Sequence, residues 1–247
     1  MSQIDNIYQD TKLNISPFRF DEQVVQVFED MINRSVPGYA QILSLLPSLT
    51  KWTIDNTQGH EPALFYDLGC SLGAGMMSLD LGVQTKIAPK NYQIIGVDNS
   101  LAMLDQARTL LKGTQYQFIQ ADATAMKYEV AKLVLMNFTL QFIAPKAREP
   151  LLEKLYDCLE TNGCLVLSEK IKPDNQAHDT VLTELHHQFK LDQGYSSLEI
   201  SQKRDALENV LQAESLTTHM RRLQRIGFKQ VIPWVQNFQF VSLLAIK

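Results

Sequence analysis

The sequence contains few cysteines, little net charge and no long apolar run, and each shortage argues against a class of protein. Its three cysteines, Cys70, Cys158 and Cys164, form neither a closely spaced metal-ligand pair nor an even set for disulfides. We therefore expect small buried thiols, a reducing compartment and no metal site. The formal net charge of −4 argues against the basic face that usually holds RNA or DNA, because neutralising phosphates supplies much of that affinity. A small-molecule substrate is favoured.

The sequence also lacks the segments that attach proteins to membranes or export them. No apolar run approaches the length that spans a bilayer, and residues 1–6 contain neither a basic nor a hydrophobic region. We expect a cytoplasmic protein without membrane contact. A hydrophobic content of 45% over 247 residues suffices for one substantial core, so we expect a single domain over residues 1–247.

What the sequence does contain is an alternation of short apolar strands with amphipathic helices. Ser100 has the N-cap residue type at the start of one predicted helix, and the turn 161–163 follows the other. The order predicts an α/β, Rossmann-like, mostly parallel seven-stranded sheet with a terminal antiparallel hairpin, as in class I methyltransferases. The predicted helices are 100–111 and 146–159, and the predicted strands are 64–68, 93–98, 116–120, 132–137, 164–168, 231–235 and 238–246.

Two segments fall outside this minimal sheet. The stretch 20–60 has a helical pattern that breaks at 34–39 before a second helix, and the stretch 177–211 has two helical parts around Gly194. Additions of this kind usually cover a cofactor or form a subunit contact. We expect an N-terminal helical cover and a helical insert within the single domain.

The loop after the first predicted strand favours S-adenosylmethionine over NAD as the bound nucleotide. That strand ends in Asp67 and continues into Gly69, and the second ends in Asp98, whose carboxylate can accept hydrogen bonds from a ribose diol. A dinucleotide fingerprint requires a second glycine where this chain has Ser71. S-adenosylmethionine has no phosphate and needs only close backbone approach and carboxylates. Gly69 and Gly73 alone are equally compatible with a tight strand-to-helix turn.

Five stretches resemble carboxy-S-adenosyl-L-methionine synthases, a family within the class I methyltransferase superfamily. The resemblance extends from about residue 20 to residue 246, and generic methyltransferases share neither the second stretch nor the fifth. The stretches are 20–25 (FDEQVV), 34–39 (RSVPGY), 66–73 (YDLGCSLG), 137–142 (NFTLQF) and 198–204 (LEISQKR).

The resemblance implies an unusual reaction on a methyltransferase fold. Members of the family convert S-adenosylmethionine and prephenate to carboxy-S-adenosylmethionine and phenylpyruvate. The product serves a separate tRNA carboxymethyltransferase that builds uridine-5-oxyacetic acid at the tRNA wobble position. The chain would thus be a homodimeric transferase that makes a cofactor and does not contact nucleic acid itself.

The resemblance also implies a set of site residues, carried over position by position. Gly69, Cys70 and Ser71 would surround the amino-acid part of S-adenosylmethionine, and Asn137 would lie near its sulfonium. Tyr39 and Arg204 would give the family its chemistry, because a guanidinium pairs with a carboxylate in bidentate fashion and a phenol can add a donor. The nucleoside contacts would be Asp98 and Asn99 at the ribose, with Asp122 and Ala123 at the adenine. The family usually has a larger aliphatic residue at position 123.

Each of these residues also has a plainer structural role. Arg204 can be a surface helix residue, Tyr39 a packing residue at a helix start, Asn137 a turn former and Asp122 a solvated loop acid. Two other classes of function therefore stay open: an ordinary methyltransferase acting on a small molecule or tRNA, and a binding module that kept the cofactor pocket.

Three further patterns have structural interpretations that we prefer. His186 and His187 are adjacent on a helix and cannot chelate one ion together, so we expect one to be half-buried and the other exposed. The cluster of Arg221, Arg222 and Arg225 is expected to form a solvated helix face. The alternating aromatics of the terminal hairpin are expected to lie in the core.

Overall fold

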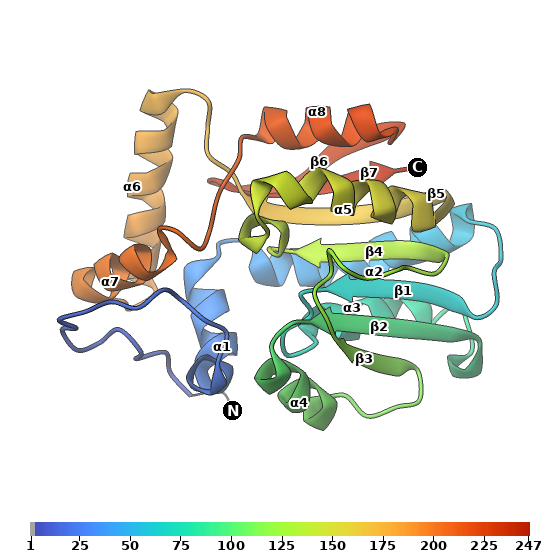
Figure 1. Ribbon diagram of the computed structural model, residues 1–247, viewed down its shortest axis with the longest axis horizontal. Coiled ribbons are helices and arrows are strands. Elements are labelled where there is room, and N and C mark those ends of the chain that lie inside the picture. Colours follow the sequence, from blue (N-terminus) through green and yellow to red (C-terminus); the bar gives the residue numbers. More distant parts are fainter. Residues whose placement is uncertain (1–2) are drawn as a thin grey trace.

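The computed structural model describes residues 3–247 and shows a three-layer α/β fold around one seven-stranded sheet (Figure 1). The strand order is β3-β2-β1-β4-β5-β7-β6, with β7 antiparallel to both of its neighbours and the other pairs parallel. The strands are β1 (Ala63–Leu68), β2 (Tyr92–Asp98), β3 (Tyr116–Gln120), β4 (Ala131–Asn137), β5 (Leu159–Lys170), β6 (Gln230–Asn237) and β7 (Phe240–Ile246). The predicted fold class is confirmed.

The helices fall into two groups. Those that flank the sheet are α2 (Tyr39–Asn56), α3 (Ala74–Val83), α4 (Leu101–Leu110), α5 (Pro145–Cys158) and α8 (Leu216–Ile226). Those that lie beyond the carboxyl ends of the parallel strands are α1 (Glu22–Ser35), α6 (Gln176–Asp192) and α7 (Ser197–Leu207). Two short 3-10 helices, η1 (Pro89–Asn91) and η2 (Leu140–Phe142), complete the set.

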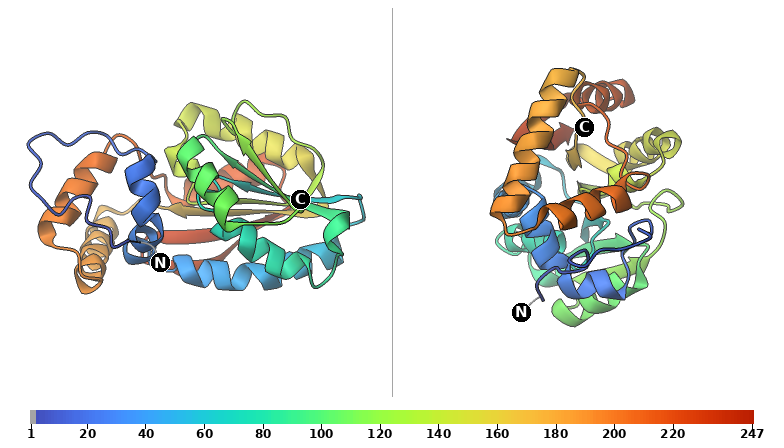
Figure 2. Two further views of the ribbon diagram at one scale, coloured as in Figure 1. Left: turned by 90° about the horizontal axis from the view of Figure 1, so that it is seen from below. Right: turned by 90° about the vertical axis from the view of Figure 1, so that its left-hand side faces the viewer.

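Each face of the sheet has its own core because its central strands are buried on both sides. Leu46 of α2 and Leu79 of α3 pack on one face, where the cluster also includes Leu104 of α4. Leu152 of α5 and Leu223 of α8 pack on the other face. Figure 2 shows α2 and α3 on the side of the sheet opposite to α5. Completely buried strands of this kind produce the continuous apolar runs seen in the sequence.

A third cluster joins the N-terminal segment to α1 and α7. It contains Phe18, Val24 and Ala206, and Phe18 N donates to Ala206 O (3.0 Å). Gln202 of α7 binds the same segment, because its Nε2 donates to Tyr8 O (2.9 Å) and its Oε1 accepts from the backbone N of residue 12 (2.7 Å). These contacts fasten α7 over the carboxyl edge of the sheet.

The start of β5 differs from its predicted position. The turn-like residues 161–163 do not separate helix from strand, since α5 ends at Cys158 and β5 begins at Leu159. They lie inside β5, where Asn162 has a positive φ of 65° and the register with β4 shifts between Ala131 and Leu133. An irregularity of this kind accommodates turn residues within a strand.

The arginine cluster of α8 is less solvated than predicted. Arg221 and Arg225 are exposed, but Arg222 is buried and pairs with Glu214 through both of its terminal nitrogens. Glu214 also pairs with Arg148 (2.6 Å), whose side chain is completely buried. The expectation of a solvated arginine face is therefore wrong for Arg222, because its partner lies on the preceding loop.

The aromatics of the terminal hairpin are only partly in the core as predicted, because Phe240 is buried whereas Trp234 and Phe238 are half-buried. The three cysteines are free and buried. His186 is buried and His187 is exposed. No helix within residues 3–247 is both long enough and apolar enough to cross a bilayer.

Candidate active site

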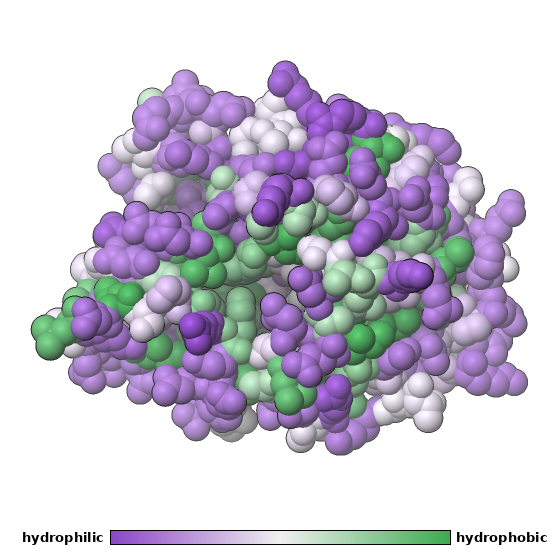
Figure 3. All heavy atoms as spheres, viewed as in Figure 1, coloured by the Kyte–Doolittle hydropathy of each residue, from purple (hydrophilic) through white to green (hydrophobic). Residues whose placement is uncertain are grey.

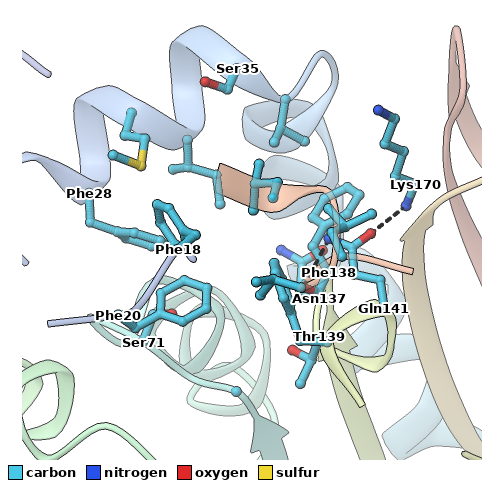
Figure 4. Close-up of a pocket in the computed structure, with 18 of the residues that line it drawn as sticks. Phe18, Phe20, Phe28, Ser35, Ser71, Asn137, Phe138, Thr139, Gln141 and Lys170 are labelled. Atoms are coloured by element: carbon cyan, nitrogen blue, oxygen red, sulfur yellow. Dashed lines mark hydrogen bonds between the residues drawn. The ribbon is translucent and has the colours of Figure 1, made fainter. Parts of the chain in front are cut away.

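A cavity of about 820 Å³ lies between the carboxyl ends of β1, β2 and β4 and the helices α1, α6 and α7. This volume suits a drug-sized ligand. Figure 3 shows the hollow, which apolar side chains border. Phe18, Phe20 and Phe28 gather on one side of the cavity and Lys170 lies on another (Figure 4). The lining residues among the predicted site residues are Gly69, Ser71, Asp98, Asn99, Asp122, Ala123, Asn137 and Arg204.

The loop after β1 is shaped by backbone contacts that bring it to the cavity wall. Gly69 has φ +74°, and a Cβ there would overlap the side chain of Thr139. Thr139 Oγ1 donates to Leu68 O (2.8 Å), so the side chain of Thr139 is fixed beside the glycine. Ser71 N donates to Asp98 Oδ2 (2.9 Å). The loop is therefore bound directly to the carboxylate at the end of β2.

Asp98 has hydrogen-bonding capacity left for a ligand. Its Oδ1 accepts from Ser100 N (2.9 Å) and its Oδ2 from Ser71 N, and each carboxylate oxygen can accept a second bond. Burial raises the pKa of Asp98, while the backbone N–H groups of Ser100 and Ser71 oppose that rise. A ribose diol would satisfy the remaining lone pairs.

Asp67 at the end of β1 is the more unusual carboxyl group. It is 2% exposed, and burial together with the charge of Asp98 raises its pKa to about 7, against a partial compensation from the Met76 N–H. Burial without a cationic partner is what produces such a value. Asp67 lies behind the loop and does not line the cavity.

Asp122 and Ala123 lie beyond the end of β3. Asp122 Oδ1 accepts from both the N–H and the hydroxyl of Thr124 (2.8 Å each). Ala123 O accepts from the hydroxyl of Tyr128 (2.6 Å). The second oxygen of the Asp122 carboxylate and the Ala123 backbone N–H are the groups that an adenine edge would use.

Asn137 at the end of β4 has a buried acceptor that a ligand in the cavity can use. Its Oδ1 is buried, and no group within residues 3–247 donates to it. Asn137 lines the cavity, and a buried acceptor without a donor costs about 1–3 kcal/mol. Together with Asp98 and the Gly69 loop, this acceptor fits S-adenosylmethionine, which carries donors on its amino and hydroxyl groups.

Tyr39 and Cys70 are the two predicted site residues that do not line this cavity. Cys70 is buried beside Met76 and Gly96, so only its backbone faces the loop. Tyr39 begins α2, and its ring lies 6.5 Å from that of Phe138. Burial, the Asp67 charge and the Glu29 charge raise the pKa of Tyr39, which keeps its phenol protonated and able to donate. Tyr39 lines a smaller adjacent cavity.

Arg204 projects from α7 at the rim of the main cavity. Its side chain is 74% exposed, and its Nη2 donates to Asp205 Oδ1 (3.2 Å). An exposed ion pair of this kind contributes little to stability. The guanidinium is therefore free to exchange Asp205 for a ligand carboxylate.

Five basic residues in the cavity lining were not predicted as site residues: Arg19, Lys170, His186, Lys190 and Lys203. The position of Lys170 at the end of β5 was a usable signal, because the carboxyl ends of parallel strands share one edge. His186 contacts Ser35 O (2.8 Å), and burial beside Lys190 lowers its pKa to about 3. No group of three metal-binding side chains occurs in the described part of the chain.

Comparisons with known proteins agree with the fold. A family model described as a methyltransferase domain matches residues 65–163. The carboxy-S-adenosyl-L-methionine synthase of Pseudoalteromonas translucida is 44% identical over 98% of each chain, and that of Shewanella sp. (strain ANA-3) is 45% identical over 98% of each chain. Human N-acetylserotonin methyltransferase superposes with a TM-score of 0.60 at 18% identity, covering 92% of this chain and 55% of that one.

Proposed function

The chain belongs to the carboxy-S-adenosyl-L-methionine synthase family, and from that premise we propose that it converts S-adenosylmethionine and prephenate to carboxy-S-adenosylmethionine and phenylpyruvate. It is an enzyme of the transferase class with S-adenosylmethionine as a substrate. The observation that carries the proposal is that Arg204 lines the same cavity as the loop, Asp98 and Asn137. A cation that can bind a carboxylate, Arg204, and the proposed nucleoside site thus lie in the same cavity.

The proposed reaction balances without an added base or oxidant. Prephenate loses its ring carboxylate as carbon dioxide, and the electron pair left behind makes the ring aromatic and expels the C4 hydroxyl as hydroxide. Hydroxide takes one proton from the sulfonium methyl group, which gives water and a sulfur-stabilised ylide. The ylide carbon then bonds to carbon dioxide. The products are phenylpyruvate, water and carboxy-S-adenosylmethionine.

The side chains of the cavity suit a scheme in which the leaving fragment accepts the proton. His186 is a poor base, because burial lowers its pKa to about 3. Phe18, Phe20 and Phe28 form an apolar wall, which limits the water that would quench an ylide. We assign the guanidinium of Arg204 as the donor to the new carboxylate. Tyr39 lines the adjacent smaller cavity, so we propose its neutral phenol as a second donor on the family resemblance.

The test is the mass of the product formed by the purified chain from S-adenosylmethionine and prephenate. We expect a species heavier than S-adenosylmethionine by one carbon dioxide, and we expect Arg204→Ala to abolish it while S-adenosylmethionine still binds. Tyr39→Phe should reduce product formation to a lesser degree. Arg221→Ala, which removes an exposed arginine on α8, is the matched control and should be fully active.

Two results would contradict parts of the proposal, one the reaction and the other the role of Arg204. Release of S-adenosylhomocysteine without any carboxylated product would identify an ordinary methyltransferase. Full activity of Arg204→Ala with prephenate would leave the reaction standing but remove the role given to Arg204.

We further propose that the product serves a separate tRNA carboxymethyltransferase, which uses it to make uridine-5-oxyacetic acid at the wobble position. The formal charge of −4 supports an enzyme that does not hold tRNA itself. We also propose that residues 1–247 act as one domain of a cytoplasmic homodimer, by analogy with the family. Sedimentation of the purified chain tests the dimer.

A further inference from the structure

The cavity has two walls of opposite charge. The wall formed by the sheet loops carries the carboxylates of Asp98 and Asp122. The opposite wall carries three lysines from three different elements: Lys170 from the end of β5, Lys190 from α6 and Lys203 from α7. Arg204 and the exposed Glu208 also line the cavity from this side, and the exposed Arg19 lines it from the N-terminal segment. A cationic substrate with a ribose is complementary to the carboxylates of the first wall. The positive charges of the second wall are complementary to an anion.

Two of these lysines have no anionic or hydrogen-bonding partner among residues 3–247, although the Lys170 ammonium lies 6.0 Å from the centroid of the Phe240 ring. Lys203 Nζ donates to Ser35 Oγ (2.9 Å) and pairs with Asp5 (3.4 Å). Asp5 is itself occupied, since its Oδ2 also accepts from the hydroxyl of Tyr195 (2.6 Å). The ammonium groups of Lys170 and Lys190 make neither a hydrogen bond nor an ion pair within residues 3–247.

The unpaired charges are also partly removed from water. Burial lowers the pKa of Lys170, and the negative charge of Asp179 opposes this change. Burial and the charges of Lys170, Lys203 and Arg204 lower the pKa of Lys190 to about 8. Desolvated ammonium groups that repel one another destabilise the folded state. Their presence in a cavity therefore indicates an anionic ligand that neutralises their charge when it binds.

We propose that Lys170 and Lys190 form a subsite for the carboxylate that the second substrate keeps, namely the oxo-acid carboxylate of prephenate that remains on phenylpyruvate. This inference rests on the proposed function. It assigns the two lysines a different task from Arg204, which receives the carboxylate that is formed on the sulfonium carbon.

The choice between the two carboxylates of prephenate follows from the energetics of the reaction. The ring carboxylate must leave as neutral carbon dioxide, so a cation bound to it would stabilise the ground state more than the transition state and would slow the step. The retained carboxylate keeps its charge throughout, so a cation bound to it contributes uniform binding. Lysine suits that task, because its ammonium is a point charge that holds an anion without fixing its orientation.

The experiment measures steady-state kinetics and product inhibition for Lys170→Met and Lys190→Met. We expect the KM for prephenate to rise about 10- to 100-fold, as for loss of a charge-assisted hydrogen bond, with kcat within about twofold of the parent. The inhibition constant of phenylpyruvate should rise by the same factor, because phenylpyruvate has only the retained carboxylate. The dissociation constant of S-adenosylmethionine should not change.

The matched control is Lys172→Met, which removes an exposed lysine two residues after Lys170 and outside the cavity lining. It should leave every constant unchanged. Denaturant unfolding of each variant checks the fold, and Lys190→Met should be at least as stable as the parent because it removes a repelled, partly buried charge.

The outcomes separate the subsite from the overall reaction. If the parent makes no carboxylated product from prephenate, the proposed function fails. If the parent makes it and both lysine variants keep the parental KM, only the subsite is refuted. If the KM for prephenate rises while phenylpyruvate inhibits unchanged, the lysines bind the departing carboxylate and the assignment to the retained one is wrong.

Discussion

Replacing Asp67 by asparagine should make the protein more stable at neutral pH, and by an amount that depends on pH. The ordinary pKa of this carboxyl is 3.8, and burial with the Asp98 charge raises it to about 7 in the folded chain. Between these values the folded state binds a proton that the unfolded state has lost, so stability falls as pH rises. At 1.36 kcal/mol per pKa unit, the full difference corresponds to at most about 4 kcal/mol.

The assay is urea unfolding of the parent and Asp67→Asn from pH 4 to pH 8. The variant keeps a side-chain oxygen that can accept from the Met76 N–H, so its advantage should grow by up to about 4 kcal/mol across this range and level off above about pH 7. Asp122→Asn, which removes an exposed carboxylate of the same wall, is the control and is unfolded over the same pH range. Parallel curves for the parent and Asp67→Asn would refute the reasoning, because they would mean that Asp67 is charged in the folded chain at pH 5.

Three further predictions concern the loop, a buried ion pair and the lysine subsite. Gly69→Ala should lower the free energy of unfolding by at least about 2 kcal/mol in urea, since alanine at φ +74° is strained and its Cβ meets Thr139. It should also weaken S-adenosylmethionine binding in calorimetry. An unchanged affinity for S-adenosylmethionine would contradict the role of Gly69 in the loop. Glu214→Gln should lower the free energy of unfolding at pH 7 by about 3 kcal/mol. The reason is that Arg222 and Arg148 lower the pKa of Glu214 to about 2 against the effect of its burial. The difference from the parent in urea unfolding should vanish as pH falls through 4.5 toward 2. Above about pH 8, Lys190 loses its proton, so the inhibition constant of phenylpyruvate should rise between pH 7.5 and 9.5 in the parent. It should rise less steeply in Lys190→Met, where only Lys170 and Lys203, whose pKa values are also lowered by burial, still lose protons. The charged and titratable groups that face Lys190 are His186, Lys170, Lys203 and Arg204.

The sheet was predictable because its central strands are buried on both faces. The predicted strand 116–120 coincides with β3, and those at 64–68, 93–98 and 132–137 each begin one residue after the observed strand. Apolar runs bounded by turn residues give this precision for the central strands, whereas β3 is an edge strand whose side chains are only partly buried. The start of β5 was missed because residues 161–163 have turn composition while they lie inside a strand with an irregular register.

The residues that line the cavity from the sheet loops were also predicted, Asp98 from its position at a strand end and Asp122 and Asn137 from the family resemblance. Asp98, Asp122 and Asn137 each follow a strand end or form one, and the carboxyl ends of parallel strands meet at one edge. By contrast, Lys190 and Lys203 lie on helices whose placement over that edge depends on tertiary contacts, such as those of Gln202 with the N-terminal segment. No local pattern distinguishes these lysines from solvated helix residues.

The distribution of the two walls along the chain suggests how a methyltransferase sheet acquires carboxylate chemistry. The groups assigned to S-adenosylmethionine come from the loops after β1, β2, β3 and β4, which belong to the minimal sheet. The groups assigned to anions come from the last residue of β5 and from the insert that begins there, α6 and α7. Lys203 is held by Asp5 and Ser35, so the N-terminal segment and α1 fix the position of α7. The position of Lys203 in the cavity therefore depends on both additions, the insert that carries it and the N-terminal cover that holds its ammonium.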